Sequence, residues 1–127
     1  MDSMNEFFSK DAFSHHCGVE LIEAGAGCAV TRMTIQPEHL NGVGVVHGGA
    51  VFALADAAFA AASNSEGRVA VAININISYL RGVKEGILTA RATEVNPDKR
   101  IGSYRVDVTD EEGQAVAVFQ GLVYRMK

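Results

Sequence analysis

Apolar and polar residues alternate along much of the second half of the chain, a pattern typical of strands with one buried face. In residues 69–80, valine, isoleucine and tyrosine recur at every second position, with residues such as Asn74 between them. Residues 100–109 alternate in the same way, whereas residues 114–126 are apolar on both faces, which indicates a central strand. A turn is expected at residues 96–99. The pattern as a whole predicts six strands, over residues 19–25, 27–36, 69–80, 86–95, 100–109 and 114–126.

Two other stretches have a helical pattern. Residues 3–18 contain Phe7, Phe8 and Phe13, and they predict one short helix with an apolar face that ends at a glycine. Residues 47–64 predict the only long helix. Strands joined by connections as short as these are expected to be antiparallel neighbours. The 127 residues therefore predict a single α+β domain, in which an antiparallel sheet packs against the long helix.

The long helix is apolar around almost its whole circumference. Val51, Phe52, Leu54 and Phe59, together with a run of alanines, leave no polar face of the kind that a surface helix has. One sheet covers one side of such a helix. We therefore expect a second copy of the chain to cover the other side, which predicts an obligate homo-oligomer.

Asp56 is the one carboxylate in this apolar helix. Its neighbours three and four residues away are Phe52, Ala53, Phe59 and Ala60, and none of them can pair with it. Burial disfavours the charged form, so the pKa of Asp56 should lie above its usual value. An unpaired carboxylate is costly to bury, and a perturbed one indicates a functional group. The alternative is a structural carboxylate that is hydrogen-bonded across a subunit interface.

The sequence His47-Gly48-Gly49 lies at the expected start of the helix. The first helical turn has free N–H groups and a partial positive charge, and glycine lets a ligand approach that backbone closely. Such a position can stabilise an oxygen that gains negative charge during a reaction. The alternative is that Gly-Gly simply forms an ordinary loop before the helix.

The spacing between these two candidates predicts a site shared between chains. Gly48 and Asp56 are separated by about 12 Å along the helix axis and by roughly 80° around it. One substrate atom cannot easily contact both residues on the same helix. In a dimer, however, Gly48 of one chain can lie near Asp56 of the partner subunit.

Composition and charge exclude several other classes of protein. The net charge of −4 offers no basic surface for nucleic acid or an anionic membrane. Cys17 and Cys28 have neither zinc-binding nor disulfide-framework spacing, and His15 and His16 have no second ligand cluster, so no metal site is expected. The acidic start of the chain lacks the apolar stretch of a signal peptide, which favours a cytoplasmic protein. His39, in a polar loop, is interpreted as a solvated residue.

Residues 39–67, HLNGVGVVHGGAVFALADAAFAAASNSEG, resemble the signature of hotdog-fold acyl-CoA thioesterases, and most of all their phenylacetate-pathway (PaaI-like) branch. The flanking residues 17–35, 77–86 and 118–126 are similar to the same family, so that the resemblance spans nearly the whole chain. It implies a hotdog fold, in which a curved antiparallel sheet wraps a long central helix. It also implies a homodimer with a continuous sheet, commonly paired into a homotetramer.

The resemblance further implies the reaction and the site. An acyl-CoA substrate with an aromatic, phenylacetyl-type acyl group would be hydrolysed at the subunit interface, with no cofactor other than the coenzyme A of the substrate itself. The Gly48 N–H would polarise the thioester carbonyl, and Asp56 of the partner subunit would act as base or nucleophile. Residues expected to bind or position the substrate are Asn41, His47, Gly49, Phe59, Asn74, Arg81 and Lys84.

Some of these residues have an alternative structural role, and some positions differ from the usual residue of the family. Phe59 is equally well explained as an ordinary core residue, and Arg81 and Lys84 as a solvated edge rather than a phosphate contact. Some relatives have a hydroxyl residue early in the strand after the helix. Here alanines stand in that stretch, and Asn74 is the nearest polar substitute. Many relatives have proline where Gly82 stands, on the expected route of the coenzyme A arm.

Two other functions are compatible with the same fold. A hotdog-fold enoyl-CoA hydratase or dehydratase would use His47 as its catalytic histidine, although its place before Gly-Gly suits site shaping better. A non-catalytic acyl-CoA-binding module would have no use for Asp56.

Overall fold

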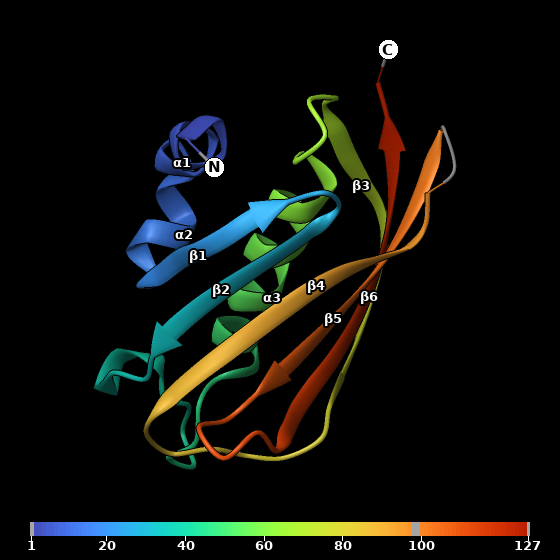
Figure 1. The fold of residues 1–127 in the computed structure, drawn as a ribbon. Coiled ribbons are helices and arrows are strands. Elements are labelled where there is room, and N and C mark those ends of the chain that lie inside the picture. The colour runs from blue at the N-terminus through green and yellow to red at the C-terminus, as the bar shows by residue number, and fades with distance from the viewer. Residues whose placement is uncertain (1, 98–99, 127) are drawn as a thin grey trace.

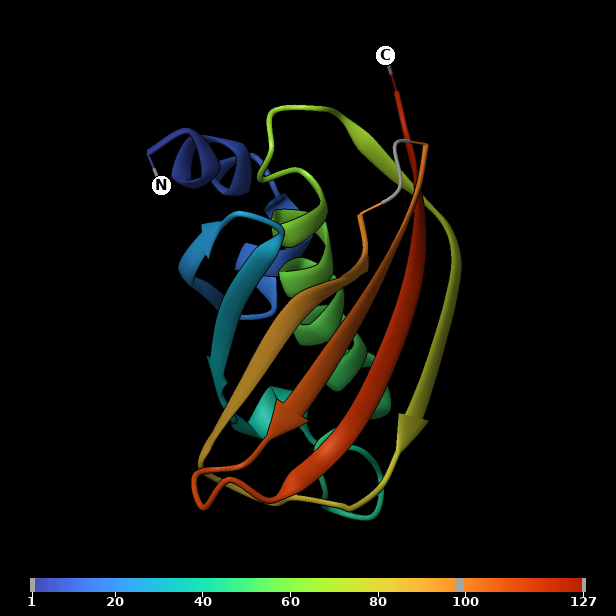
Figure 2. The ribbon, with the colours of Figure 1, turned by 45° about the vertical axis from the view of Figure 1, so that its right-hand side comes forward.

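The computed structural model describes residues 2–97 and 100–126, and its strands form one curved antiparallel sheet around a long helix (Figures 1 and 2). The helices are α1 (Asp2–Ser9), α2 (Ala12–His16) and α3 (Gly48–Ser63), with a 3₁₀ turn at Pro37–His39. The strands are β1 (Val19–Gly25), β2 (Cys28–Thr34), β3 (Ala70–Tyr79), β4 (Ile87–Asn96), β5 (Ile101–Thr109) and β6 (Ala115–Arg125). Their order across the sheet is β1-β2-β4-β5-β6-β3. The predicted fold class is confirmed, while part of the turn expected at residues 96–99 lies outside the described residues.

The core lies between α3 and the concave face of the sheet. The small side chains of α3 allow the strands to approach its backbone closely, and the buried Thr31 hydroxyl donates a hydrogen bond of 2.9 Å to the Leu54 carbonyl. Alternate residues of the central strands face the helix and are fully buried. They include Leu88, Ala90, Tyr104, Val106, Val108, Phe119 and Val123.

Helix α3 is covered by its own chain more completely than its composition suggested. Because the sheet curves, it contacts the helix along several strands, and β1 and α2 cover a further part. Within α3, only Gly48, Gly49, Phe52, Asp56 and Ala60 keep exposed surface, and they form a row along the helix that is here called the open stripe. The expectation that a partner must cover the whole other side of the helix was therefore too broad. The homo-oligomer stays a prediction, confined to this narrow stripe.

A bulge in β3 corrects the predicted alternation of that strand. The register with β6 shifts between Ala72 and Asn74, so the residues before and after the shift face opposite ways. Val71 pairs with Tyr124 on the outer face, whereas Ile75 pairs with Gly121 on the helix side. The apolar residues of 69–80 therefore do not share one face.

The connection from β3 to β4 is not the hairpin that its length suggested. Strand β3 pairs with β6 at one edge of the sheet, and β4 pairs with β2 and β5. The segment between β3 and β4 runs across one end of the sheet instead (Figure 1). Along it, the chain passes close to the start of α3, which matters for the site.

The N-terminal helical segment is two helices rather than one. Asp11 interrupts it, because its carboxylate caps α2 by accepting hydrogen bonds from the Ser14 N–H (3.0 Å) and the Ser14 hydroxyl (2.7 Å). Of the three phenylalanines expected to form one apolar face, only Phe8 is buried, whereas Phe7 and Phe13 are exposed.

The contact between Gly121 and Phe59 predicts a stability effect. A Cβ added at Gly121 would lie 2.6 Å from Phe59 Cζ, and the Phe59 ring is held against Tyr104 and Phe119 in the core. Gly121→Ala is expected to lower the free energy of unfolding by about 1–3 kcal/mol through overpacking. Thermal melts should show a lowered Tm. In the control Gly42→Ala, where the new Cβ meets nothing within 4 Å, the Tm should be unchanged.

Candidate active site

The start of α3 leaves one backbone donor without a partner. His47 caps the helix: its Nδ1 accepts the Gly49 N–H at 2.8 Å, and its carbonyl accepts the N–H groups of Ala50 and Val51. Of the four N–H groups that a helix start leaves unpaired, only that of Gly48 has no acceptor among the described residues. This donor lies at the positive end of the helix dipole and can bind an oxygen atom.

Tyr79 holds the other side of this glycine. Its hydroxyl donates a hydrogen bond of 3.0 Å to the Gly48 carbonyl, and a Cβ at Gly48 would lie 3.2 Å from Tyr79 Cζ. A Cβ at residue 48 would therefore crowd the Tyr79 ring, and glycine eases the close approach of the end of β3 to the helix start. Sequence reasoning placed Tyr79 on the face of a strand and missed its contact with Gly48.

A cleft of about 430 Å³ opens beside Gly48. It brings together three residues predicted from the sequence, because Asn41 and Arg81 line it with Gly48. Tyr79 and apolar residues of the neighbouring loops complete its wall. The Oδ1 of Asn41 accepts the N–H groups of Val43 and Val45 at 3.0 and 3.2 Å, so this side chain shapes the loop that borders the cleft.

His39 supports the same loop from inside the protein. The interpretation of His39 as solvated was wrong, because the residue is buried. Its Nδ1 accepts the Gln36 N–H at 2.8 Å, its Nε2 lies 2.7 Å from the Cys17 carbonyl, and its own carbonyl accepts the His47 N–H at 2.7 Å. His39 thereby ties the loop before α3 to the N-terminal part of the chain.

Arg81 and Lys84 differ in their surroundings. Arg81 forms an ion pair with Asp110, and the N–H of Gln114 together with Arg81 holds the pKa of Asp110 below its usual value. Lys84 is exposed and lines a neighbouring cleft together with Arg81 and acidic residues such as Glu111. Arg81 thus borders both clefts, and Lys84 borders only the second.

Asp56 lies on the open stripe, half-buried, and accepts no hydrogen bond from the described residues. Burial raises its pKa above the usual value, and the negative charge of Asp11 raises it further. Asp56 does not line the cleft at Gly48. One chain therefore carries both groups at separate places on the same helix.

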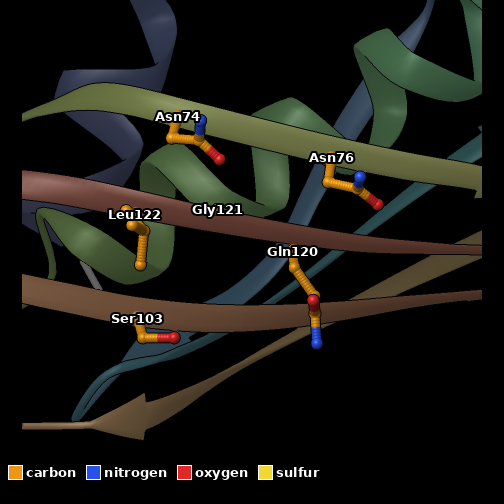
Figure 3. Close-up of a pocket in the computed structure, with 6 residues that line it drawn as sticks. All are labelled: Asn74, Asn76, Ser103, Gln120, Gly121 and Leu122. Atoms are coloured by element: carbon orange, nitrogen blue, oxygen red, sulfur yellow. The ribbon is translucent and has the colours of Figure 1, made fainter.

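The remaining predicted residues lie elsewhere. Asn74 is on the outer face of the sheet, where it lines a depression of about 240 Å³ with Asn76, Ser103 and Gln120 (Figure 3). It points away from α3, so the structure does not bring it to Gly48. Phe59 is fully buried between α3 and the sheet, which matches its alternative role as a core residue. Gly49, by contrast, is exposed on the open stripe.

Two other features, a metal site and a membrane-spanning helix, are not found in the described part of the chain. Within residues 2–97 and 100–126, no three histidine, cysteine or acidic side chains are arranged to hold a metal ion. Over the same residues, no helix has the length and hydrophobicity needed to cross a membrane.

An antiparallel sheet curved around one long helix, with an open donor at the helix start, is the hotdog class of protein. Residues 43–117 match the family described as the thioesterase superfamily, and the chain belongs to that superfamily as a thioester hydrolase of the PaaI-like branch.

Relatives of this chain match over most of their length. The acyl-coenzyme A thioesterase PaaI of Escherichia coli K12 is 38% identical over 120 residues, which cover 94% of this chain and 86% of that protein. The solved structure of the E. coli PaaI protein from the phenylacetic acid degradation operon has a TM-score of 0.92 at 35% identity and covers 97% of this chain and 90% of its own. A mutant structure of the phenylacetic acid degradation protein PaaI from Thermus thermophilus has a TM-score of 0.86 at 40% identity, covering 91% of this chain and 99% of its own.

Proposed function

We propose that this protein is a cytoplasmic acyl-CoA thioesterase that hydrolyses aromatic, phenylacetyl-type thioesters to the free acid and coenzyme A. The observation that carries the proposal is the unused Gly48 N–H at the positive end of α3, beside a cleft that Asn41 and Arg81 also line. The E. coli relative at 38% identity, which bears the name acyl-coenzyme A thioesterase, supports the substrate class. The reaction consumes water and thioester only, so no cofactor is needed.

In the proposed reaction, the thioester oxygen accepts a hydrogen bond from the Gly48 N–H. Attack by water on the carbonyl carbon forms a new C–O bond and moves negative charge onto the carbonyl oxygen, where the helix start stabilises it. Asp56 takes the proton of the attacking water, and its raised pKa makes it a stronger base than an ordinary carboxylate. The C–S bond then breaks, and the coenzyme A thiolate leaves and takes up a proton.

The carboxylate that takes the proton of the attacking water is proposed to come from Asp56 of the partner subunit. Gly48 and Asp56 of one chain lie about 12 Å apart along α3, which is too far for one carbonyl group. The open stripe carries Asp56 and is the part of α3 that its own chain leaves accessible. A homodimer that brings two such stripes together would form two shared sites, and pairing of dimers would give the homotetramer.

A mixing experiment tests the shared site. Gly48→Pro removes the donor, and Asp56→Asn removes the base, so each homodimer alone should be inactive. After subunit exchange, about a quarter of the wild-type rate should return, because half of the dimers are mixed and each contains one intact site. Exchange confirmed by mass spectrometry with no recovered activity would contradict a site shared between chains.

The reaction itself is tested with a panel of aryl- and alkyl-CoA thioesters, following the release of free thiol. Thiol release, with a preference for aryl groups, is expected. Hydration of enoyl-CoA without thiol release would instead favour a hydratase that uses His47. Binding of thioesters without turnover would favour a non-catalytic acyl-CoA-binding module.

Asp11 offers a test of the charge environment of Asp56. Asp11→Asn keeps an oxygen that can cap α2 but removes the negative charge that helps to raise the pKa of Asp56. The pKa of Asp56 should fall, so the acidic limb of the kcat profile should move to lower pH. Because burial is the larger cause, the movement should be partial. An unmoved limb, with the variant folded, would contradict a charge coupling between Asp11 and the titrating base.

A further inference from the structure

A further cleft adjoins the open stripe one helical turn beyond Asp56. It measures about 290 Å³ and is lined by Phe7 and Lys10 of the N-terminal segment, by Asp11, and by Ala60 of α3. Ala60 follows Asp56 by four residues, which is about 6 Å along the axis. Both residues lie on the open stripe, so the cleft lies one helical turn from Asp56 on the same side of the helix.

The lining of this cleft suits an apolar group. The Phe7 ring is 44% exposed and the methyl group of Ala60 is partly exposed, while the alkyl stem of Lys10 adds further apolar surface. The Asp11 carboxylate is already engaged by the N–H and hydroxyl of Ser14. The cleft therefore has apolar walls and a charged rim.

Helix α1 is held firmly enough to form one wall. Its own side chains Met4 and Phe8 are buried in the core. The Phe8 ring centroid lies 4.9 Å from that of His15, and His15 Nε2 lies 3.0 Å from the Phe8 carbonyl. With its neighbour Phe8 in the core, Phe7 is left facing outward beside α3. Its exposure thus follows from the way in which α1 is anchored.

We propose that this cleft between α1 and α3 binds the aromatic ring of the acyl group, with Phe7 packing against the ring and Ala60 leaving room for it. This inference rests on the proposed function. A thioester carbonyl beside Asp56 would direct its acyl group along the open stripe, and one helical turn is comparable with the length of a phenylacetyl group beyond its carbonyl carbon. A cavity of about 150 Å³ can already hold benzene, so the volume is sufficient. The Phe7 ring would add an offset or edge contact, and the Lys10 ammonium could lie near the ring face.

Two substitutions test the cleft by comparing phenylacetyl-CoA with acetyl-CoA. Ala60→Leu fills it and should lower kcat/KM for phenylacetyl-CoA at least tenfold, with acetyl-CoA changed less than twofold. Phe7→Ala should raise KM for phenylacetyl-CoA by about three- to tenfold through the lost ring contact. Ala60→Ser and Phe13→Ala are matched controls, because the first keeps the volume and the second removes an exposed ring outside the cleft. Both controls should leave both substrates unchanged.

The outcomes separate this inference from the proposed function. If the wild type releases thiol but Ala60→Leu affects both substrates equally, or neither, the ring does not bind here. A changed molecular mass of Ala60→Leu or Phe7→Ala in light scattering would show a subunit contact instead, and would overturn the proposal. If the wild type hydrolyses neither thioester, the proposed function fails. Calorimetric titration with phenylacetate then decides on the cleft: binding that Ala60→Leu abolishes supports it, and absent or unchanged binding rejects it.

Discussion

Asp56→Asn is expected to lower kcat for thioester hydrolysis by about 10²–10⁴-fold and, at neutral pH, to raise the Tm. The loss of activity follows from the loss of the base. The gain in stability follows from the position of Asp56, which is half-buried and lacks a hydrogen-bond partner among the described residues. Enzyme assays and thermal melts of the same preparations check both effects.

The direction of the stability change depends on pH. The pKa of Asp56 is higher in the folded protein than in the unfolded chain, so the folded state binds more protons between the two pKa values. The wild type is therefore most stable below the unfolded pKa and loses stability as the pH rises through the folded pKa. Asparagine does not titrate, so its advantage should be present at pH 7 and should disappear in acid.

Asp107→Asn is the matched control, because Asp107 is also half-buried but pairs with Arg105. The Asp107→Asn variant should show neither the loss of kcat nor the rise in Tm that is expected of Asp56→Asn. A lowered Tm for Asp56→Asn at pH 7 would contradict the catalytic interpretation. It would favour the alternative, a structural carboxylate that is hydrogen-bonded across a subunit interface.

Gly48→Pro is expected to lower kcat by about 10²–10³-fold relative to Gly48→Ala, because it removes the donor to the developing oxyanion. Proline is well tolerated at the first position of a helix. The preceding residue, His47, already has the extended conformation that proline requires, with φ −65° and ψ 138°. The lost N–H has no acceptor among the described residues, so the helix loses no internal hydrogen bond.

Gly48→Ala is the essential comparison. Both substitutions place a Cβ about 3.2 Å from Tyr79 Cζ, so both share this contact with the ring, but alanine keeps the N–H. The difference between the two variants therefore isolates the donor. Equal activities of the two variants, with α3 intact by circular dichroism, would mean that the oxyanion is bound elsewhere.

The fold was predictable because most of its elements follow simple periodicities. Alternation along residues 100–109 and the apolar run of residues 114–126 predicted two strands that are confirmed, and the second has a neighbouring strand on each side, as expected of a central strand. Strand β3 misled the sequence reading because one bulged residue moves all later side chains to the other face. The break between α1 and α2 was missed because it depends on whether Asp11 caps a new helix or points to solvent, and both are compatible with the sequence.

The site was predictable where its residues are close in sequence or share a motif. Asn41 and Gly48 fall within one loop and helix start, and both line the cleft. Tyr79 and His39 were missed because their contacts depend on distant segments that only tertiary packing brings together. Asn74 was assigned to the site because it is the nearest polar residue along the strand to the missing hydroxyl. In the structure it follows the bulge in β3 and lies on the outer face.

The order of the strands also has a consequence for how the chain acquires its structure. Strand β3 precedes β4 and β5 in sequence but pairs only with β6, so it has no partner until the last strand of the sheet is available. Until then, the segment AVAININIS remains open, with high β-propensity and no charge. Such long-range pairing is slow, and unpaired apolar strands associate with other chains. During synthesis, this segment is therefore where aggregation is expected to compete most strongly with folding.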